Sequence, residues 1–230
     1  MKKHFHFRFW PTLLTAIMLA VLLGLGTWQV QRLHWKQNLL AEIDARIHAA
    51  PVDVAGLTDS VDANYLPATA SGIFQDDHLF YLFSTSLTGV GGYHVLTPLK
   101  LADGRMLLID RGWIPYDRKG NFSQSVGPVT VTGILRKPEH YWLQPKNDPA
   151  RGIWYSIDLV AMAQQAGITA FLPYVLEVDA APHPDGYPVG GQTRLTLPSN
   201  HFVYALTWYG LAVALLIIYA LSSFGKNSED

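Results

Sequence analysis

The sequence predicts an α+β membrane protein in which a two-helix transmembrane hairpin flanks one β-rich extracytoplasmic domain. The helices are predicted by two apolar segments, residues 9–31 and 200–224, which contain no Asp, Glu, Lys or Arg. About 20 such residues cross the hydrocarbon core of a bilayer as a helix. Between them, residues 32–199 hold short runs rich in Val, Ile, Thr, Tyr and Phe. These runs favour a small antiparallel sheet that is curled on itself or closed like a barrel.

The composition excludes several classes of function. The formal net charge is −1, and no long run of basic residues occurs. We therefore expect no binding of nucleic acid. Cysteine is absent, which excludes disulfides, thiolate metal sites and thiol catalysis.

The first apolar segment is predicted to remain as an anchor rather than to be cleaved as a signal peptide. It is longer than an ordinary signal core, and residues 24–28 form a poor cleavage site. Lys2, Lys3 and Arg8 precede this span and Lys226 follows the second. The positive charges favour a cytoplasmic location for both tails, 1–8 and 225–230. In a bacterium this predicts a multi-pass protein of the inner membrane whose main domain is periplasmic.

The elements between the spans follow from periodicity and turn residues. Helical periodicity continues over Gln31–Ala50 and ends at Pro51, and Asp103-Gly104 is a hairpin turn signal. A short helix is expected over Asp158–Ala166, with Asp158 as N-cap and Gly167 as its stop. Ser199 or Asn200 is expected to cap the second span. The expected strands are Ala68–Phe74, Leu79–Thr85, Tyr93–Leu99, Met106–Trp113, Val129–Leu135, Ile153–Ile157 and Tyr174–Val178.

Polar and aromatic side chains gather at the outer ends of both predicted spans. A hairpin brings these ends to the same side of the membrane, where the two sets would line one aromatic cleft. The first span contributes Trp28, Arg32 and Trp35 at spacing i, i+4, i+7, with Gln29 and Lys36 on neighbouring stripes. The second span contributes His201, Tyr204 and Trp208 at spacing i, i+3, i+7.

This set admits two interpretations. Such residues at a membrane interface ordinarily form an aromatic belt or reach toward lipid head groups. His201 favours a binding site, because the positive end of a helix dipole disfavours the imidazolium and leaves a neutral, ligating imidazole. A haem would suit the cleft, with His201 on the iron, the aromatic side chains on the ring and Arg32 and Lys36 on the propionates. His34 is the candidate for a second ligand.

Other candidate residues predict structure rather than chemistry. His78 and His94 are expected on the surface or satisfied in the core. Asp110-Arg111 is expected to form a structural ion pair before a turn. The motifs of α/β-hydrolases, P-loop proteins, dinucleotide-binding proteins and zinc proteases are absent from the sequence. The sequence therefore predicts a protein that is not an enzyme.

Two signature segments lie on the two predicted spans. Residues 26–36 are similar to a G-x-W-Q-x-x-R-x-x-W-K pattern, and residues 200–208 are similar to N-H-x-x-Y-A-x-T-W. The blocks at 92–99, 110–115 and 133–136, and Asn147-Asp148-Pro149 with Trp154 and Asp158, follow in the same order. Together these segments resemble the Surfeit locus protein 1 family of cytochrome oxidase assembly factors. Many members carry a second Asn where this chain has Ser199, a departure that concerns helix capping.

The resemblance implies a part in the assembly of a haem-copper terminal oxidase such as cytochrome c oxidase. It implies transient binding of haem a, with His201 as the proposed ligand of the haem iron and Trp208 associated with haem handling. The implied partners are oxidase subunit I and haem a synthase, beside the lipid bilayer. Two alternatives stay open. One is a haem-free scaffold or chaperone that stabilises subunit I, and the other is a membrane-tethered envelope enzyme, which no motif supports.

Overall fold

The computed structural model describes residues 8–57, 61–123, 125–139, 143–181, 185–194 and 200–223. By its internal contacts the chain divides into two units. One unit, the helix pair, comprises Met1–Glu42 and Thr196–Asp230, and the other, the barrel domain, comprises Ile43–Leu195. The predicted cytoplasmic tails, apart from Arg8, and the predicted cap Ser199 lie outside the described residues.

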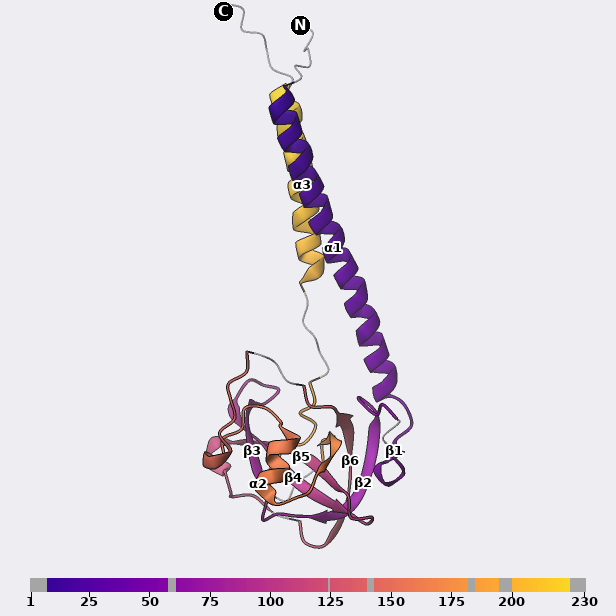
Figure 1. The fold of residues 1–230 in the computed structure, drawn as a ribbon, viewed down its shortest axis with the longest axis vertical. Coiled ribbons are helices and arrows are strands. Elements are labelled where there is room, and N and C mark those ends of the chain that lie inside the picture. The colour runs from indigo at the N-terminus through magenta and orange to yellow at the C-terminus, as the bar shows by residue number, and fades with distance from the viewer. Residues whose placement is uncertain are drawn as a thin grey trace, which may run out of the picture. The chain divides into compact units, whose positions relative to one another are not determined.

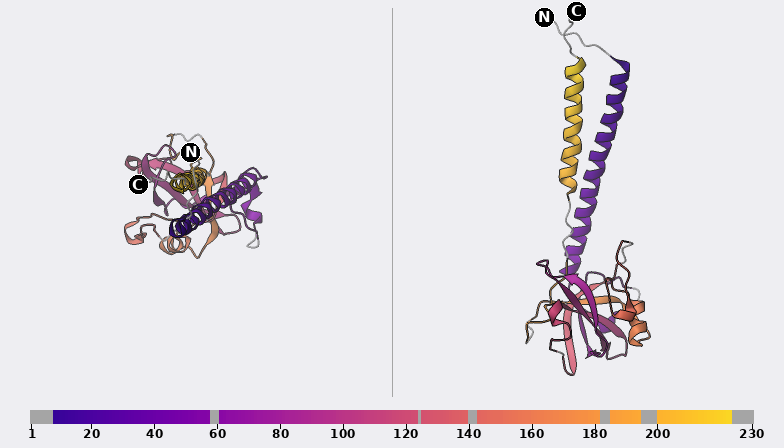
Figure 2. Two further views of the ribbon diagram at one scale, coloured as in Figure 1. Left: turned by 90° about the horizontal axis from the view of Figure 1, so that it is seen from above. Right: turned by 90° about the vertical axis from the view of Figure 1, so that its left-hand side faces the viewer.

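The helix pair is formed by two long apolar helices that run side by side (Figure 2). Helix α1 spans Phe9–Ile47 and helix α3 spans His201–Ser223. Both are long and apolar enough to cross a membrane by length and composition. Helix α1 runs unbroken through the first predicted span and its helical continuation, and it ends at Ile47 rather than Ala50. Helix α3 starts where expected, with the Asn200 carbonyl accepting the Tyr204 N–H at 3.0 Å.

The barrel domain is built on one mixed sheet (Figure 1). Its strand order is β1-β2-β6-β7-β5-β4-β3, and an additional pairing joins β2 to β4. The strands β2, β6, β7, β5 and β4 therefore form a closed ring, which confirms the prediction of a curled or barrel-like sheet. The strands described are β1 Val52–Asp53, β2 Pro67–Phe74, β3 Phe80–Thr85, β4 Gly91–Leu101, β5 Met106–Pro115, β6 Pro128–Arg136 and β7 Phe171–Val178.

The prediction of a purely antiparallel sheet is wrong. Strand β5 pairs with β7 in parallel, and β1 pairs with β2 in parallel. A parallel pair needs a long crossover rather than a tight turn. The chain provides this length for β5 and β7, because β6 and helix α2, Leu159–Ala166, lie between them.

The local predictions are confirmed for most elements and wrong for one strand. Asp158 caps α2 by accepting the Val160 and Ala161 N–H groups, and Gly167 ends the helix at a φ of 65°. The segment Ile153–Ile157 is not a strand, because its pairings in the described chain are isolated bridges. Its apolar character has another cause, since Trp154 is 1% exposed beneath α2.

Two layers of apolar side chains bury the two faces of the sheet. The first layer draws residues from each strand of the closed ring and therefore fills its interior; it includes Ala68, Phe74, Leu99, Leu107, Ile109, Leu135 and Leu176. The second layer lies between the outer face and α2; it includes Phe80, Leu96, Leu108, Trp154, Met162 and Val175. Because both faces are covered, neighbouring residues of β5, such as Leu107 and Leu108, are both fully buried.

Candidate functional site

The two helices of the helix pair pack along a seam that contains several small residues. Ala205 and Ala212 are buried on α3, and Leu22 is buried on α1. Gly26 of α1 is also buried, and a Cβ at this position would overlap the ring of Tyr209. Small residues at such positions let two apolar helices approach closely. The approach of the two helices at this point therefore depends on the missing Cβ of Gly26.

Hydrogen bonds between side chains cross the same seam. The hydroxyls of Thr12 and Tyr219 lie 2.6 Å apart, and those of Thr27 and Tyr209 lie 3.2 Å apart. These hydrogen bonds stabilise the helix pair most where water is absent, because a hydroxyl in an apolar surrounding has no other hydrogen-bond partner. They hold α1 and α3 in one antiparallel register, which places the first turn of α3 beside the middle of α1.

His201 lies at this end of the seam and is tied to α1. Its Nδ1 is 2.7 Å from Oε1 of Gln29. An amide oxygen can only accept a hydrogen bond, so Nδ1 carries the proton and donates it. A ring that is protonated at Nδ1 alone has its lone pair at Nε2. The geometry therefore holds His201 in the tautomer in which Nε2 can bind a metal.

The other predicted site residues occupy different stripes of the two helices. Trp28 and Tyr204 are 50% and 52% exposed. The guanidinium carbon of Arg32 lies 5.0 Å from the ring centre of Trp35, which agrees with their predicted common face. Lys36 is half-buried on the stripe of Gln29.

Helical spacing explains why some of these residues are half-buried and others are exposed. Gln29, Leu33 and Lys36 are half-buried on the seam side of α1, whereas Trp28, Arg32, His34 and Trp35 are exposed. On α3, His201 and Trp208 are half-buried with the buried Ala205 between them. The structure thus brings His201 together with Gln29. It leaves the aromatic stripe of Trp28 and Trp35 open to the surroundings of the pair.

The barrel domain carries a polar cluster on its outer face. Nδ1 of His94 on β4 lies 2.6 Å from Oδ2 of Asp110 on β5, and their side chains are 13% and 8% exposed. Glu177 on β7 is the register partner of Asp110. Burial, together with the Asp110 carboxylate, raises the pKa of Glu177. Burial opposes the charged form of His94, but the Asp110 carboxylate outweighs it and raises the pKa of His94.

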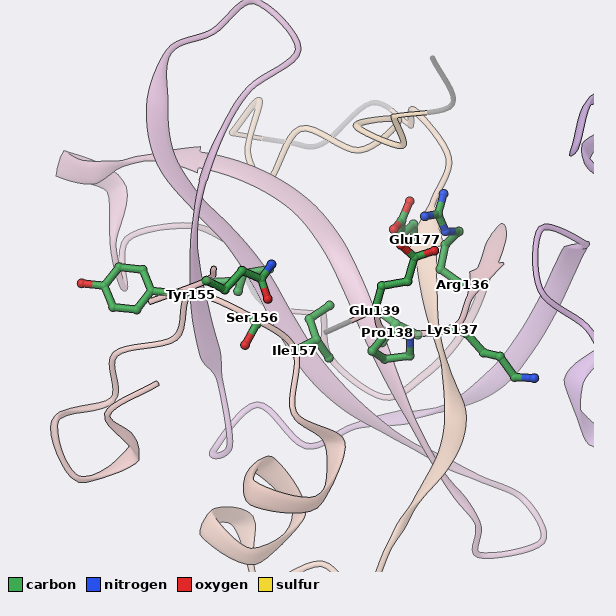
Figure 3. A pocket seen from close by; sticks show the side chains of 11 residues that line it. Arg136, Lys137, Pro138, Glu139, Tyr155, Ser156, Ile157 and Glu177 are labelled. Atoms are coloured by element: carbon green, nitrogen blue, oxygen red, sulfur yellow. The ribbon is translucent and has the colours of Figure 1, made fainter. Parts of the chain in front are cut away.

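Two adjoining cavities open on this cluster. His94, Asp110, Glu177, Arg136 and Arg194 line one cavity of about 200 Å³. Arg136 and Glu177 also line its neighbour of about 210 Å³. Figure 3 shows Glu139 beside these two residues and Tyr155 at the opposite end. The lining of the first cavity carries two carboxylates, Asp110 and Glu177, two guanidinium groups, Arg136 and Arg194, and the imidazole of His94. We interpret the cluster as a buried polar network of the fold rather than a reaction centre.

The structure confirms part of what the sequence predicts for the isolated histidines and the Asp110-Arg111 pair. His94 is satisfied in the core, and the side chain of His78 is 38% exposed on the surface. Asp110 and Arg111 do not pair with each other, because successive residues of a strand face opposite sides. Arg111 instead binds Asp76 at 2.9 Å and lies against the ring of Phe74. Burial of Asp76 raises the pKa of its carboxyl, although Arg111 opposes that shift.

The fold and the helix pair define a class: a protein with two apolar helices that indicate membrane association and one closed β domain. The model of the SURF1 family matches residues 16–213. Surfeit locus protein 1 of Mus musculus is 35% identical over 216 residues, covering 85% of this chain and 70% of the mouse protein. Its Homo sapiens counterpart is 33% identical over 213 residues, covering 83% and 70%. A SURF1-like protein of Rickettsia felis is 26% identical over 216 residues, covering 91% and 95%.

This chain therefore belongs to the SURF1 family. The resemblance of the two signature segments is thus confirmed over most of the chain. Members of the family are known as cytochrome oxidase assembly factors and are not known as enzymes.

Proposed function

We propose that this protein is a membrane-anchored assembly factor for a haem-copper terminal oxidase, and that it binds haem a transiently through His201. One observation carries the haem proposal: the Nδ1 of His201 donates to Gln29 at 2.7 Å, so Nε2 is the ring nitrogen left to bind iron. Ligand histidines in metalloproteins are commonly oriented by such a hydrogen bond from their other nitrogen.

The single imidazole at this site fits an iron whose other ligands come from a porphyrin. In the described residues, no three His, Asp or Glu side chains gather to hold a bare metal ion. A haem needs no such cluster, because the porphyrin supplies four nitrogens and the protein supplies an axial imidazole. When bound, the haem would provide the iron that the oxidase requires. His201 would hold that iron with a single protein ligand, and single ligation favours later release.

Residues at the same end of the helix pair as His201 would serve the remaining parts of a haem. Arg32 and Lys36 follow Gln29 by one and two turns of α1 and carry the cations that would pair with two propionates. Trp28, Tyr204 and Trp208 offer aromatic surface at the same end of the helix pair. The apolar stripes beyond them suit the hydrocarbon tail of haem a in lipid.

We also propose a membrane topology and binding partners for this protein. Both tails would lie in the cytoplasm, and the barrel domain would lie in the periplasm beside the inner membrane. The barrel domain would dock nascent oxidase subunit I and haem a synthase, and the protein would itself catalyse no reaction.

The test is the haem content of the full-length protein purified from membranes that contain haem a. We expect haem a in the wild type, a large loss or a shifted spectrum in His201→Ala, and unchanged content in His34→Ala, which alters an exposed histidine of α1. Equal binding by His201→Ala would refute His201 as the ligand. Colourless wild-type protein would favour the alternative of a haem-free scaffold that stabilises subunit I.

A further inference from the structure

The turn between β3 and β4 presents two exposed aliphatic side chains on a hydrogen-bonded backbone. Leu87 and Val90 are 55% and 52% exposed. Ser86 closes the turn, because its N–H donates to the Val90 carbonyl at 2.8 Å and its hydroxyl accepts the Val90 N–H at 3.1 Å. Gly89, at a φ of 85°, supplies the left-handed backbone conformation that the turn requires. We name these residues, 86–90, the apolar turn.

The apolar turn is clamped to the segment that leads into α3. The guanidinium of Arg194 donates to the carbonyls of Thr85 and Ser86 at 2.8 and 2.9 Å. The Leu87 N–H donates to the side chain of Gln192 at 3.0 Å. These hydrogen bonds tie the turn to residues 192–194.

The sequence limits how far this clamp lies from the start of α3. Seven Cα steps join Arg194 to His201, and an extended chain of that length reaches about 25 Å at most. The head-group regions of a bilayer extend roughly 5–8 Å beyond the hydrocarbon on each side. If α3 starts at that boundary, the chain length keeps Arg194 within about 25 Å of it and allows the apolar turn to reach the membrane surface. The segment 84–93 also contains no charged residue that would oppose such an approach.

We propose that the apolar turn contacts lipid, with Leu87 and Val90 entering the boundary between head groups and acyl chains. This inference rests on the membrane anchoring in the proposed function. Not every exposed aliphatic residue of the described chain has this clamp and tether. Val160, for example, is 69% exposed on α2, which packs at the Phe80 end of β3, and the apolar turn follows the opposite end. The contact would add a second, shallow attachment of the barrel domain to the membrane.

The test uses single cysteines in the full-length protein, which has none of its own. Leu87→Cys, Val90→Cys, Val160→Cys and Leu216→Cys are labelled with a nitroxide in vesicles of phosphatidylethanolamine and phosphatidylglycerol. Collisions with oxygen, which concentrates in lipid, are compared with collisions with a water-soluble nickel chelate. We expect the ratio of oxygen to nickel collisions at residues 87 and 90 to exceed that at Val160 severalfold. Leu216, 45% exposed on α3, should give the highest ratio.

The controls separate failure of this inference from failure of the anchoring. Equal ratios at residues 87, 90 and 160, with a high ratio at 216, would overturn the lipid contact and leave the membrane anchor intact. A low ratio at 216 as well would overturn both, because α3 itself would then be outside lipid. Each substitution replaces an exposed side chain, so the fold is expected to survive all four.

Discussion

The hydrogen bond between Gln29 and His201 gives the sharpest prediction about the helix pair. Gln29→Leu keeps the size of the side chain but removes the oxygen that accepts from Nδ1 of His201. The imidazole would then lose the bond that selects its tautomer and fixes the direction of Nε2. We expect the His201 ring to remain present but to bind haem less tightly.

The expected magnitude follows from this geometry. At 2.7 Å the bond is short and neutral, and such a bond contributes roughly 0.5–1.5 kcal/mol net. Loss of the partner that orients a metal-bound histidine typically costs about 10–100-fold in metal affinity, which corresponds to about 1.4–2.7 kcal/mol. The two ranges meet near tenfold, which is our expectation for Gln29→Leu. Gln29→Glu should instead bind at least as tightly, because a carboxylate accepts a stronger bond and makes Nε2 more basic.

The assay is titration of the purified apoprotein in lipid nanodiscs with haem a, followed by the shift of its visible absorption. Gln31→Leu is the matched control, because Gln31 is an exposed glutamine of the same helix on another face. We expect the order of affinity to be wild type equal to Gln31→Leu, above Gln29→Leu, and above His201→Ala. If Gln29→Leu binds as tightly as Gln31→Leu, the hydrogen bond does not orient the ligand and the reasoning is wrong.

Two further predictions concern the barrel domain and are measured by thermal unfolding of the full-length protein followed by circular dichroism. The folded-state pKa of Glu177 is raised above 4.5, so the folded domain binds more protons than the unfolded chain and stability falls as the pH rises through that pKa. Glu177→Gln should therefore raise the midpoint temperature at pH 8 more than at pH 4; an equal change at both pH values would contradict the linkage. Gly112→Ala should destabilise the folded barrel domain. The φ of 117° costs alanine about 1–3 kcal/mol, and the overlap of its Cβ with the carbonyl of Val189 adds to that cost. Gly56→Ala, where a Cβ meets open space, should stay near neutral, and equal effects of the two substitutions would refute this reasoning.

Element prediction succeeded where local chemistry decides the backbone. Asp158 and Gly167 bracket α2 as expected, because an N-cap carboxylate and a left-handed glycine act on their own turns. The segment Ile153–Ile157 was assigned wrongly, because an apolar run indicates burial but not the structure that buries it. Trp154 is covered by α2 and β3, so its burial does not require residues 153–157 to pair as a strand.

The candidate site was predicted only in part for a similar reason. Spacing placed Arg32 and Trp35 on one face, and the structure confirms that pair. Spacing could not show which face meets α3, because both helices are apolar on nearly every side within the predicted spans. That choice depends on the close approach allowed at Gly26. The polar cluster of the barrel domain was missed, although Glu177 within an apolar strand was a signal that could have indicated it.

The sequence by itself determined the two apolar helices, the β-rich domain between them and the family to which the chain belongs. These features depend on local composition and on short patterns, which act within a few residues. The tertiary structure alone decided the closed ring, the parallel pairing of β5 with β7 and the partner of His201. Asp110 meets Glu177, and Gln29 meets His201, across long stretches of chain. Such contacts depend on how whole elements pack, which no local pattern specifies.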